Sequence, residues 1–173
     1  MGTGAAGEAD FTAFTQATYA SLLRTARLLT GDSHAAEDLV QAALVKVYLH
    51  WSRSAAWASP QAYARKVVVN LYATWRRRRW HAEIAHSDHA AEADGRDMAG
   101  GAEARLELAR ALTTLPRAQR AVVVLRFYED LSVEETAELL GCSPGTVKSR
   151  TNRALERLRA TGVLAGYAGR AAR

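Results

Sequence analysis

The sequence predicts an all-α protein made of two small helical domains joined by a flexible linker. Apolar residues recur every three or four positions along most of the 173 residues, the spacing that brings them to one face of a helix. No stretch alternates polar and apolar residues as a half-buried strand would. The helical spacing stops at residues 81–101, which are rich in alanine, glycine, histidine and acidic residues. We therefore expect a tether there.

The first domain is expected over residues 10–80. Its first helix ends at Gly31, because glycine favours the left-handed turn that closes a helix. The third helix begins at Ser59-Pro60, a capping residue followed by a first-turn proline. Each of the three expected helices has an inward-facing apolar stripe. These are Phe11, Phe14, Leu22, Ala26 and Leu29 in the first helix; Ala36, Leu39, Val40, Ala43, Leu44, Val47 and Trp51 in the second; and Tyr63, Val67, Val68, Leu71 and Trp75 in the third.

The second domain is expected over residues 102–161, with a break at Pro116. Ser132 and Glu135 have the spacing of a capping box, which starts a helix. Gly141 then permits a tight turn, and Ser143-Pro144 starts the last helix. This pattern is typical of a helix-turn-helix. Residues 162–173 form a tail with too few large apolar side chains to fold alone.

The composition makes several classes of protein improbable. Cys142 is the single cysteine, so no internal disulfide forms and a cysteine-built zinc site is not expected. No apolar run reaches the roughly 18–20 residues of a membrane span, and the acidic N-terminus is unlike a secretory signal, so a cytoplasmic protein without membrane insertion is predicted.

No enzyme motif is present, and no catalytic, cofactor or metal site is predicted. The sequence contains neither a glycine-rich phosphate loop nor a nucleophile motif. The alternative is a metal cluster, which would consist of His81, Glu83, His86, Asp88 and His89. A glycine-rich segment would not fix the geometry of such ligands, so a solvated linker is the favoured interpretation.

The net charge of +5 is concentrated in two basic segments. Residues 51–80 contain seven basic residues and no acidic one, and residues 142–173 contain seven basic residues and one acidic one. Two separate basic segments in an otherwise acidic chain indicate contact with a polyanion at two places. The alternative is a pair of ordinary solvated helix faces.

The last helix is expected to present a short, polar and basic face. When Val147, Ala154 and Leu158 point inward, the outward residues are Gly145, Ser149, Asn152 and Arg153, flanked by Lys148 and Arg150. Such side chains suit the major groove, where Arg or Lys bonds guanine and Asn bonds adenine. The alternative is an amphipathic helix with a charged outside.

The central basic segment combines cations with aromatic rings. Six of the thirteen aromatic residues lie between Trp51 and Trp80. Cations hold phosphates and aromatic faces stack on unpaired bases, so this segment suits a single strand. Core packing is favoured for Tyr63 and Trp75, and the run 76–79 is alternatively a solubilising helix end. The outer face of the helix after Pro60 consists of Arg65, Lys66, Val69, Asn70, Ala73, Arg76 and Arg77.

The helix before it has an apolar outer face rimmed by an acid and an amide. Opposite its buried stripe lie Asp38, Gln41, Ala42, Val45 and Leu49. A partner protein would cover such a surface. The alternative is a set of scattered apolar residues, which are normal on protein surfaces.

Taken together, these segments resemble the extracytoplasmic-function (ECF) sigma factors of the sigma-70 family. The segment from Ala36 to Gln41 is similar to the part of that family that grips the clamp helices of core RNA polymerase. The resemblance implies a transcription initiation factor that is not an enzyme, needs no cofactor, and binds core polymerase (clamp helices and flap) and promoter DNA, with an anti-sigma factor as a candidate inhibitor. Its implied polymerase contacts are Asp38, Leu39, Gln41, Ala42, Val45 and Leu49.

The resemblance also assigns the two basic faces. The segment 62–79 is similar to the part that melts and reads the minus-ten element, where Asn70 and the loop 52–59 would hold a flipped base. The stretch 115–159 is similar to the domain that reads the minus-thirty-five element. It implies that Lys148, Ser149 and Asn152 read this element and that Arg150, Arg153 and Arg157 hold phosphates, with Thr146 as a further contact to the same DNA.

A helix-turn-helix regulator that binds operators without polymerase is the remaining alternative. It would need a dimer interface or an effector pocket, and it would leave the aromatic-basic segment unexplained.

Overall fold

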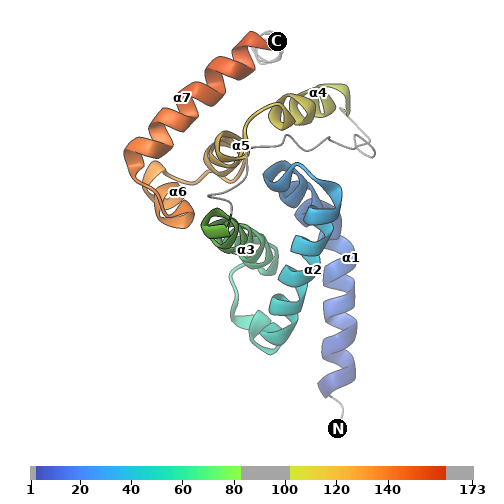
Figure 1. The fold of residues 1–173 in the computed structure, drawn as a ribbon. Helices are drawn as coiled ribbons and strands as arrows, with labels where there is room; N and C mark the ends of the chain where they lie inside the picture. Colours follow the sequence, from blue (N-terminus) through green and yellow to red (C-terminus); the bar gives the residue numbers. More distant parts are fainter. Residues whose placement is uncertain (1–2, 83–101, 163–173) are drawn as a thin grey trace.

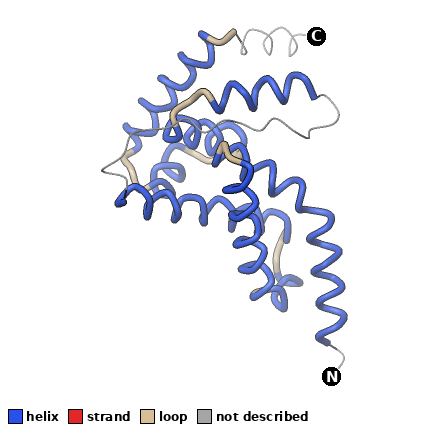
Figure 2. The backbone as a smooth tube through the Cα atoms, turned by 45° about the vertical axis from the view of Figure 1, so that its right-hand side comes forward, coloured by secondary structure: helices blue, strands red, loops and turns tan. Residues whose placement is uncertain are grey.

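The computed structural model describes residues 3–82 and 102–162, and helices dominate this part of the chain, with no strand in it (Figures 1 and 2). The predicted all-α class is confirmed. The first group of helices consists of α1 (Thr3–Thr30), α2 (Ser33–Leu49), a 3-10 turn (Trp51–Ala56) and α3 (Pro60–Ala82). The second consists of α4 (Ala102–Thr113), α5 (Arg117–Val123), a π-helical turn (Val124–Tyr128), α6 (Val133–Leu140) and α7 (Pro144–Ala160). Nearly all of the predicted linker and tail lies outside the described residues.

The helix ends in the first group follow from local chemistry. Gly31 has φ +68° and closes α1, and the Asp32 carboxylate accepts a hydrogen bond of 2.7 Å from the Ala35 N–H at the start of α2. Ser59 accepts from the Ala62 N–H at 3.2 Å, ahead of Pro60. Both ends of the first domain differ from the prediction. The domain was expected over residues 10–80, but α1 already begins at Thr3 and α3 continues to Ala82.

The buried side chains of both groups form one continuous hydrophobic core. In the first group α2 and α3 bury Leu39, Val40 and Val68, and in the second α5 and α7 bury Val122 and Leu158. The second group is packed against the first, with α5 beside α1 and α6 beside α3 (Figure 1). The two predicted domains therefore share an interface.

The described residues contain neither a membrane-spanning helix nor a cluster of metal-binding side chains. None of their helices combines the length and the apolar character needed to cross a membrane. Nor does this part of the chain bring three or more His, Cys, Asp or Glu side chains together as a metal site would require. Apart from His81, the residues of the metal cluster considered as an alternative lie outside the described residues.

Candidate nucleic-acid interface

The helix-turn-helix is fixed by two serine caps and one glycine. The Ser132 hydroxyl accepts from the Glu135 N–H at 3.0 Å, and the Glu135 carboxylate accepts from the Ser132 N–H at 2.7 Å. These hydrogen bonds hold the pKa of the Glu135 carboxyl below its ordinary value. Gly141 has φ +63°, and Ser143 caps α7 by accepting from the Thr146 N–H at 3.1 Å. The predicted capping box and turn are confirmed.

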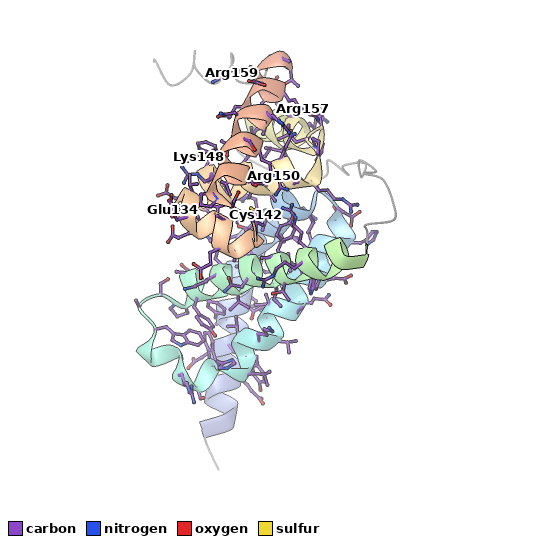
Figure 3. All side chains as sticks on the ribbon, turned by 60° about the vertical axis from the view of Figure 1, so that its left-hand side comes forward. Glu134, Cys142, Lys148, Arg150, Arg157 and Arg159 are labelled. Atoms are coloured by element: carbon purple, nitrogen blue, oxygen red, sulfur yellow. The ribbon has the colours of Figure 1, made fainter. Side chains whose placement is uncertain are left out.

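One face of α7 is buried and the other is open. Val147, Ala154 and Leu158 are buried in the core. The basic side chains Lys148, Arg150, Arg157 and Arg159 follow one another along the helix (Figure 3). Of the predicted minus-thirty-five contacts, Lys148, Ser149, Asn152, Arg153 and Arg157 are exposed, whereas Thr146 and Arg150 are half-buried. The structure also exposes Arg159, a basic residue that sequence reasoning left out.

The predicted face of α3 is only partly open. Arg65, Lys66, Asn70 and Arg77 are exposed and Arg76 is half-buried. Val69 and Ala73 are 5% and 1% exposed, so the expectation that they face solvent is wrong for this conformation. At about 100° per residue, both lie on the far side of α3 from the stripe that packs on α1 and α2. The second domain, which contacts α3 through α6, covers them there.

The aromatic rings of the first domain pack mainly on one another. Trp57, in the loop before α3, stacks on Tyr63 with ring centroids 4.1 Å apart and meets Trp51 edge-on at 5.9 Å. Trp51 in turn contacts Phe14 at 4.8 Å. These side chains are partly buried against the core, as expected for Tyr63. The rings therefore brace the loop 52–59 against α1 and α3.

The outer face of α2 is exposed and largely apolar. Val45 and Leu49 are 60% and 70% exposed, beside exposed Asp38 and Gln41 and half-buried Ala42. Leu39 is fully buried between the helices of the first domain, so its assignment to this surface is wrong. Tyr48, which sequence reasoning missed, adds an exposed ring that contacts Phe11.

Sequence reasoning also missed the residues that join the two domains. Arg120 of α5 is 2% exposed, and its guanidinium donates hydrogen bonds to the backbone carbonyls of Thr30 (2.6 Å) and Leu29 (3.5 Å) at the end of α1. Burial lowers the pKa of Arg120, and nearby Tyr72 partly opposes this effect. The sequence carried no signal for this role, because the apolar stripe Ala118, Ala121, Val122 and Leu125 places Arg120 on the opposite face of its helix.

Two sequence families cover most of the chain. Residues 14–82 match Sigma-70 region 2, and residues 105–158 match Sigma-70, region 4. The RNA polymerase sigma-E factor of Streptomyces avermitilis is 40% identical over 150 residues, which span 87% of this chain and 83% of that protein. This chain belongs to the sigma-70 family of RNA polymerase sigma factors.

Other relatives of this sigma factor place it among the ECF type. The ECF RNA polymerase sigma factor SigL of Mycobacterium tuberculosis is 35% identical over 146 residues, or 82% of each chain. A solved structure of the sigma factor RpoE from Bartonella quintana, in complex with the anti-sigma factor NepR, is 26% identical with a TM-score of 0.51. That match covers 90% of this chain and 96% of the other. The chain is thus a regulatory factor that acts with RNA polymerase in promoter-specific initiation of transcription.

Proposed function

We propose that this sigma factor reads the minus-thirty-five promoter element as duplex with α7 and the minus-ten element as a melted strand with α3. The observation that carries the proposal is that the basic surfaces of α7 and α3 differ in their aromatic surroundings. The α7 surface is polar and carries no aromatic ring, whereas the α3 surface adjoins a loop braced by stacked rings. Paired bases are read by hydrogen bonds in the major groove, while unpaired bases need a preformed, partly aromatic site.

At α7, exposure and chemistry divide the side chains into two roles. Lys148, Ser149 and Asn152 are exposed near the start of the helix, where a recognition helix meets base edges. Arg153 and Arg157 lie further along and hold phosphates, as does half-buried Arg150. Thr146 positions the first turn, because its hydroxyl lies 2.9 Å from that of Ser143.

At α3, Asn70 is the exposed residue whose amide can bond a base edge, together with the loop 52–59. Arg65, Lys66, Arg76 and Arg77 attract the phosphates of the strand. Val69 and Ala73 complete the surface only when the second domain moves away from α3. This division assigns residues 10–80 to core binding and minus-ten recognition, and residues 102–161 to minus-thirty-five recognition.

In this proposal core polymerase makes two contacts. Its clamp helices bind the outer face of α2 in the first domain, and its flap binds the second domain. An exposed apolar centre with a polar rim is the usual make-up of a protein interface. An anti-sigma factor is a further candidate partner, since the related RpoE was solved with one. We place the protein in the cytoplasm with its polymerase, without an enzymatic activity of its own.

Loss of core binding tests the α2 surface. The double variant Asp38→Ala, Gln41→Ala should weaken association with purified core polymerase, measured by fluorescence anisotropy of the labelled protein. Asp10→Ala, Gln16→Ala is the matched control, because it removes an exposed acid and an exposed amide from α1. Equal affinity of the two double variants would remove Asp38 and Gln41 from the interface.

A further inference from the structure

We propose that Trp57 is a positioning residue for reading the minus-ten element. It does not contact the base itself, but it holds the loop 52–59 at a fixed place beside Asn70, in the shape that accepts a base. The inference rests on the proposed role of α3 and this loop. Its physical basis is a set of ring contacts that join Trp57 to the start of the loop and to α3.

The loop has little in its own sequence to give it one shape. Residues 52–56 are Ser, Arg, Ser, Ala and Ala, so no large apolar side chain lies between Trp51 and Trp57. A backbone hydrogen bond of 3.0 Å, from the Arg53 N–H to the His50 carbonyl, fixes the start of the turn. A segment that buries so little apolar surface does not offset the entropy of ordering. A loop that must select one base therefore has to be held from outside.

Ring contacts supply that hold at both sides of residues 52–56. Trp51 and Trp57 meet edge-on with centroids 5.9 Å apart, which closes this part of the loop onto itself. Trp57 also stacks on Tyr63 of α3, with centroids 4.1 Å apart and ring planes 25° apart. Both arrangements are favourable for aromatic pairs. The loop is thus anchored to α3 through Trp57.

Tyr63 relates the position of the loop to that of Asn70. The two residues are seven positions apart on α3, so they lie within about 20° of each other around the helix axis and about 10 Å apart along it. Tyr63 is half-buried and Asn70 is exposed. A ring stacked on Tyr63 therefore stands on the side of α3 that carries the Asn70 amide. The stack sets the place of the loop relative to that amide.

The Trp57 ring is already engaged by these contacts. It is half-buried, it packs against the hydrophobic core, and it touches the rings of both Trp51 and Tyr63. A residue that stacks on an unpaired base needs an open aromatic face instead. The observed contacts make Trp57 a brace for the loop.

Cations near Asn70 do not depend on this brace. Lys66 and Arg77 are exposed and lie within about 40° of Asn70 around α3, one turn before it and two turns after it. The phosphates of a strand keep these partners when Trp57 is removed. Loss of the brace should therefore lower the discrimination between bases more than the affinity for the strand.

Base preference at the minus-ten element measures the positioning. Polymerase holoenzyme with each variant would select from a promoter library randomised at that element. Trp57→Leu should lower the preference for the best base about tenfold, which is within the discrimination that one base contact supplies. Trp57→Tyr keeps a ring and should restore most of the preference. Trp75→Leu is the matched control, because Trp75 packs on the core about 120° around α3 from Tyr63.

A double variant tests if the stack with Tyr63 is the route of the effect. Tyr63→Leu breaks the same contact from the side of α3, and it replaces Trp57→Leu should circular dichroism show that the latter is unfolded. Because both act through one contact, the double variant should lose no more preference than either single variant. Hydrogen exchange of residues 52–59 in the free protein should be up to about tenfold faster in Trp57→Leu, the free energy of one aromatic pair expressed as a ratio.

Three results would overturn the inference. The first is a folded Trp57→Leu variant that keeps the base preference of the parent. The second is an equal loss of preference in Trp75→Leu, and the third is a double variant in which the two losses add. Asn70→Ala separates these failures from failure of the proposed function, because an unchanged preference in Asn70→Ala would count against the role of α3 itself.

Discussion

Gly31 is the residue at which backbone conformation and domain packing meet. Its φ of +68° disfavours any side chain, and the guanidinium of Arg120 fills the space that a Cβ would need. Gly141 has a similar φ of +63°, but a Cβ there would meet only the flexible Arg77 side chain at 3.5 Å. The two glycines therefore separate the cost of a strained backbone from the cost of displacing the Arg120 guanidinium.

Alanine at each glycine is expected to lower the free energy of unfolding by different amounts. Gly141→Ala should cost about 1–2 kcal/mol, the penalty of a left-handed residue with a Cβ. Gly31→Ala should cost about 1–3 kcal/mol more, because Arg120 must be displaced. Urea unfolding followed by circular dichroism measures both, and equal costs would show that Arg120 does not depend on Gly31.

Asn152 and Arg153 are adjacent exposed residues with different proposed roles. Asn152→Ala should cost about 1–3 kcal/mol at one upstream base pair and relax specificity there. Arg153→Ala should weaken all sequences alike and reduce the slope of log affinity against log salt by about one. Binding of polymerase holoenzyme to a promoter library at several salt concentrations distinguishes them, and unchanged base preference in Asn152→Ala would remove that residue from the reading face.

Glu129 makes stability depend on pH. Burial raises the pKa of its carboxyl above the ordinary value, despite the opposing effects of Arg65 and the Thr25 hydroxyl. The folded state therefore holds this proton more tightly than the unfolded state does. The contribution of Glu129 to stability is thus fully present below the unfolded pKa and is lost as pH rises through the folded pKa.

Glu129→Gln should remove this loss, so the variant should be more stable than the parent at pH 7. Its amide oxygen can still accept the hydrogen bond from Thr25, and no charge is buried. Urea unfolding between pH 4 and pH 8 gives the profile, with Glu138→Gln, at an exposed acid of α6, as the control. A variant less stable than the parent at pH 7 would mean that attraction to Arg65 outweighs burial.

At the scale of the elements, the caps and turns of α6 and α7 depend on neighbours within four residues. Ser132→Ala should lower the free energy of unfolding by about 1 kcal/mol, since it removes the cap of α6. Ser149→Ala is the control, because that hydroxyl is exposed and bonds only the Thr146 carbonyl of its own helix. Comparable losses in the two variants would argue against the capping box as a source of stability.

The same locality explains how much of the fold could be predicted. Ser132, Gly141, Ser143 and Pro60 announce their helix ends from adjacent residues, so the helix-turn-helix and the all-α class followed from the sequence. Burial of Val69 and Ala73 depends on a domain far along the chain, and no helical period reports it. The sequence favoured an exposed Val69 because one helix considered alone has only one buried face.

The contacts of Arg120 and Glu129 lay beyond prediction for a related reason. Their partners Thr30 and Thr25 are 90 and 104 residues away, and helical spacing carries no information on such pairs. The π-helical turn Val124–Tyr128 adds a second difficulty, because it changes the register just before Glu129. That register leaves Phe127 and Tyr128 exposed while the Glu129 carboxylate turns toward the first domain.

At the scale of the whole molecule, the proposed function requires two domains with different DNA surfaces to act on one promoter. In the proposed function, the exposed α2 surface binds polymerase and the exposed face of α7 binds duplex DNA. The proposed strand-binding face of α3 differs from both, because its Val69 and Ala73 are buried. This difference matches the chemistry of initiation, in which a single strand exists only after the duplex has been opened.

Strand opening is therefore the most direct test of the account. Promoters selected by the holoenzyme from a genomic DNA pool would be treated with permanganate, which oxidises unpaired thymines. Reactive thymines are expected around the minus-ten element only when this protein and core polymerase are both present. Association with core polymerase without any promoter-specific opening, or opening by the protein alone, would contradict the account.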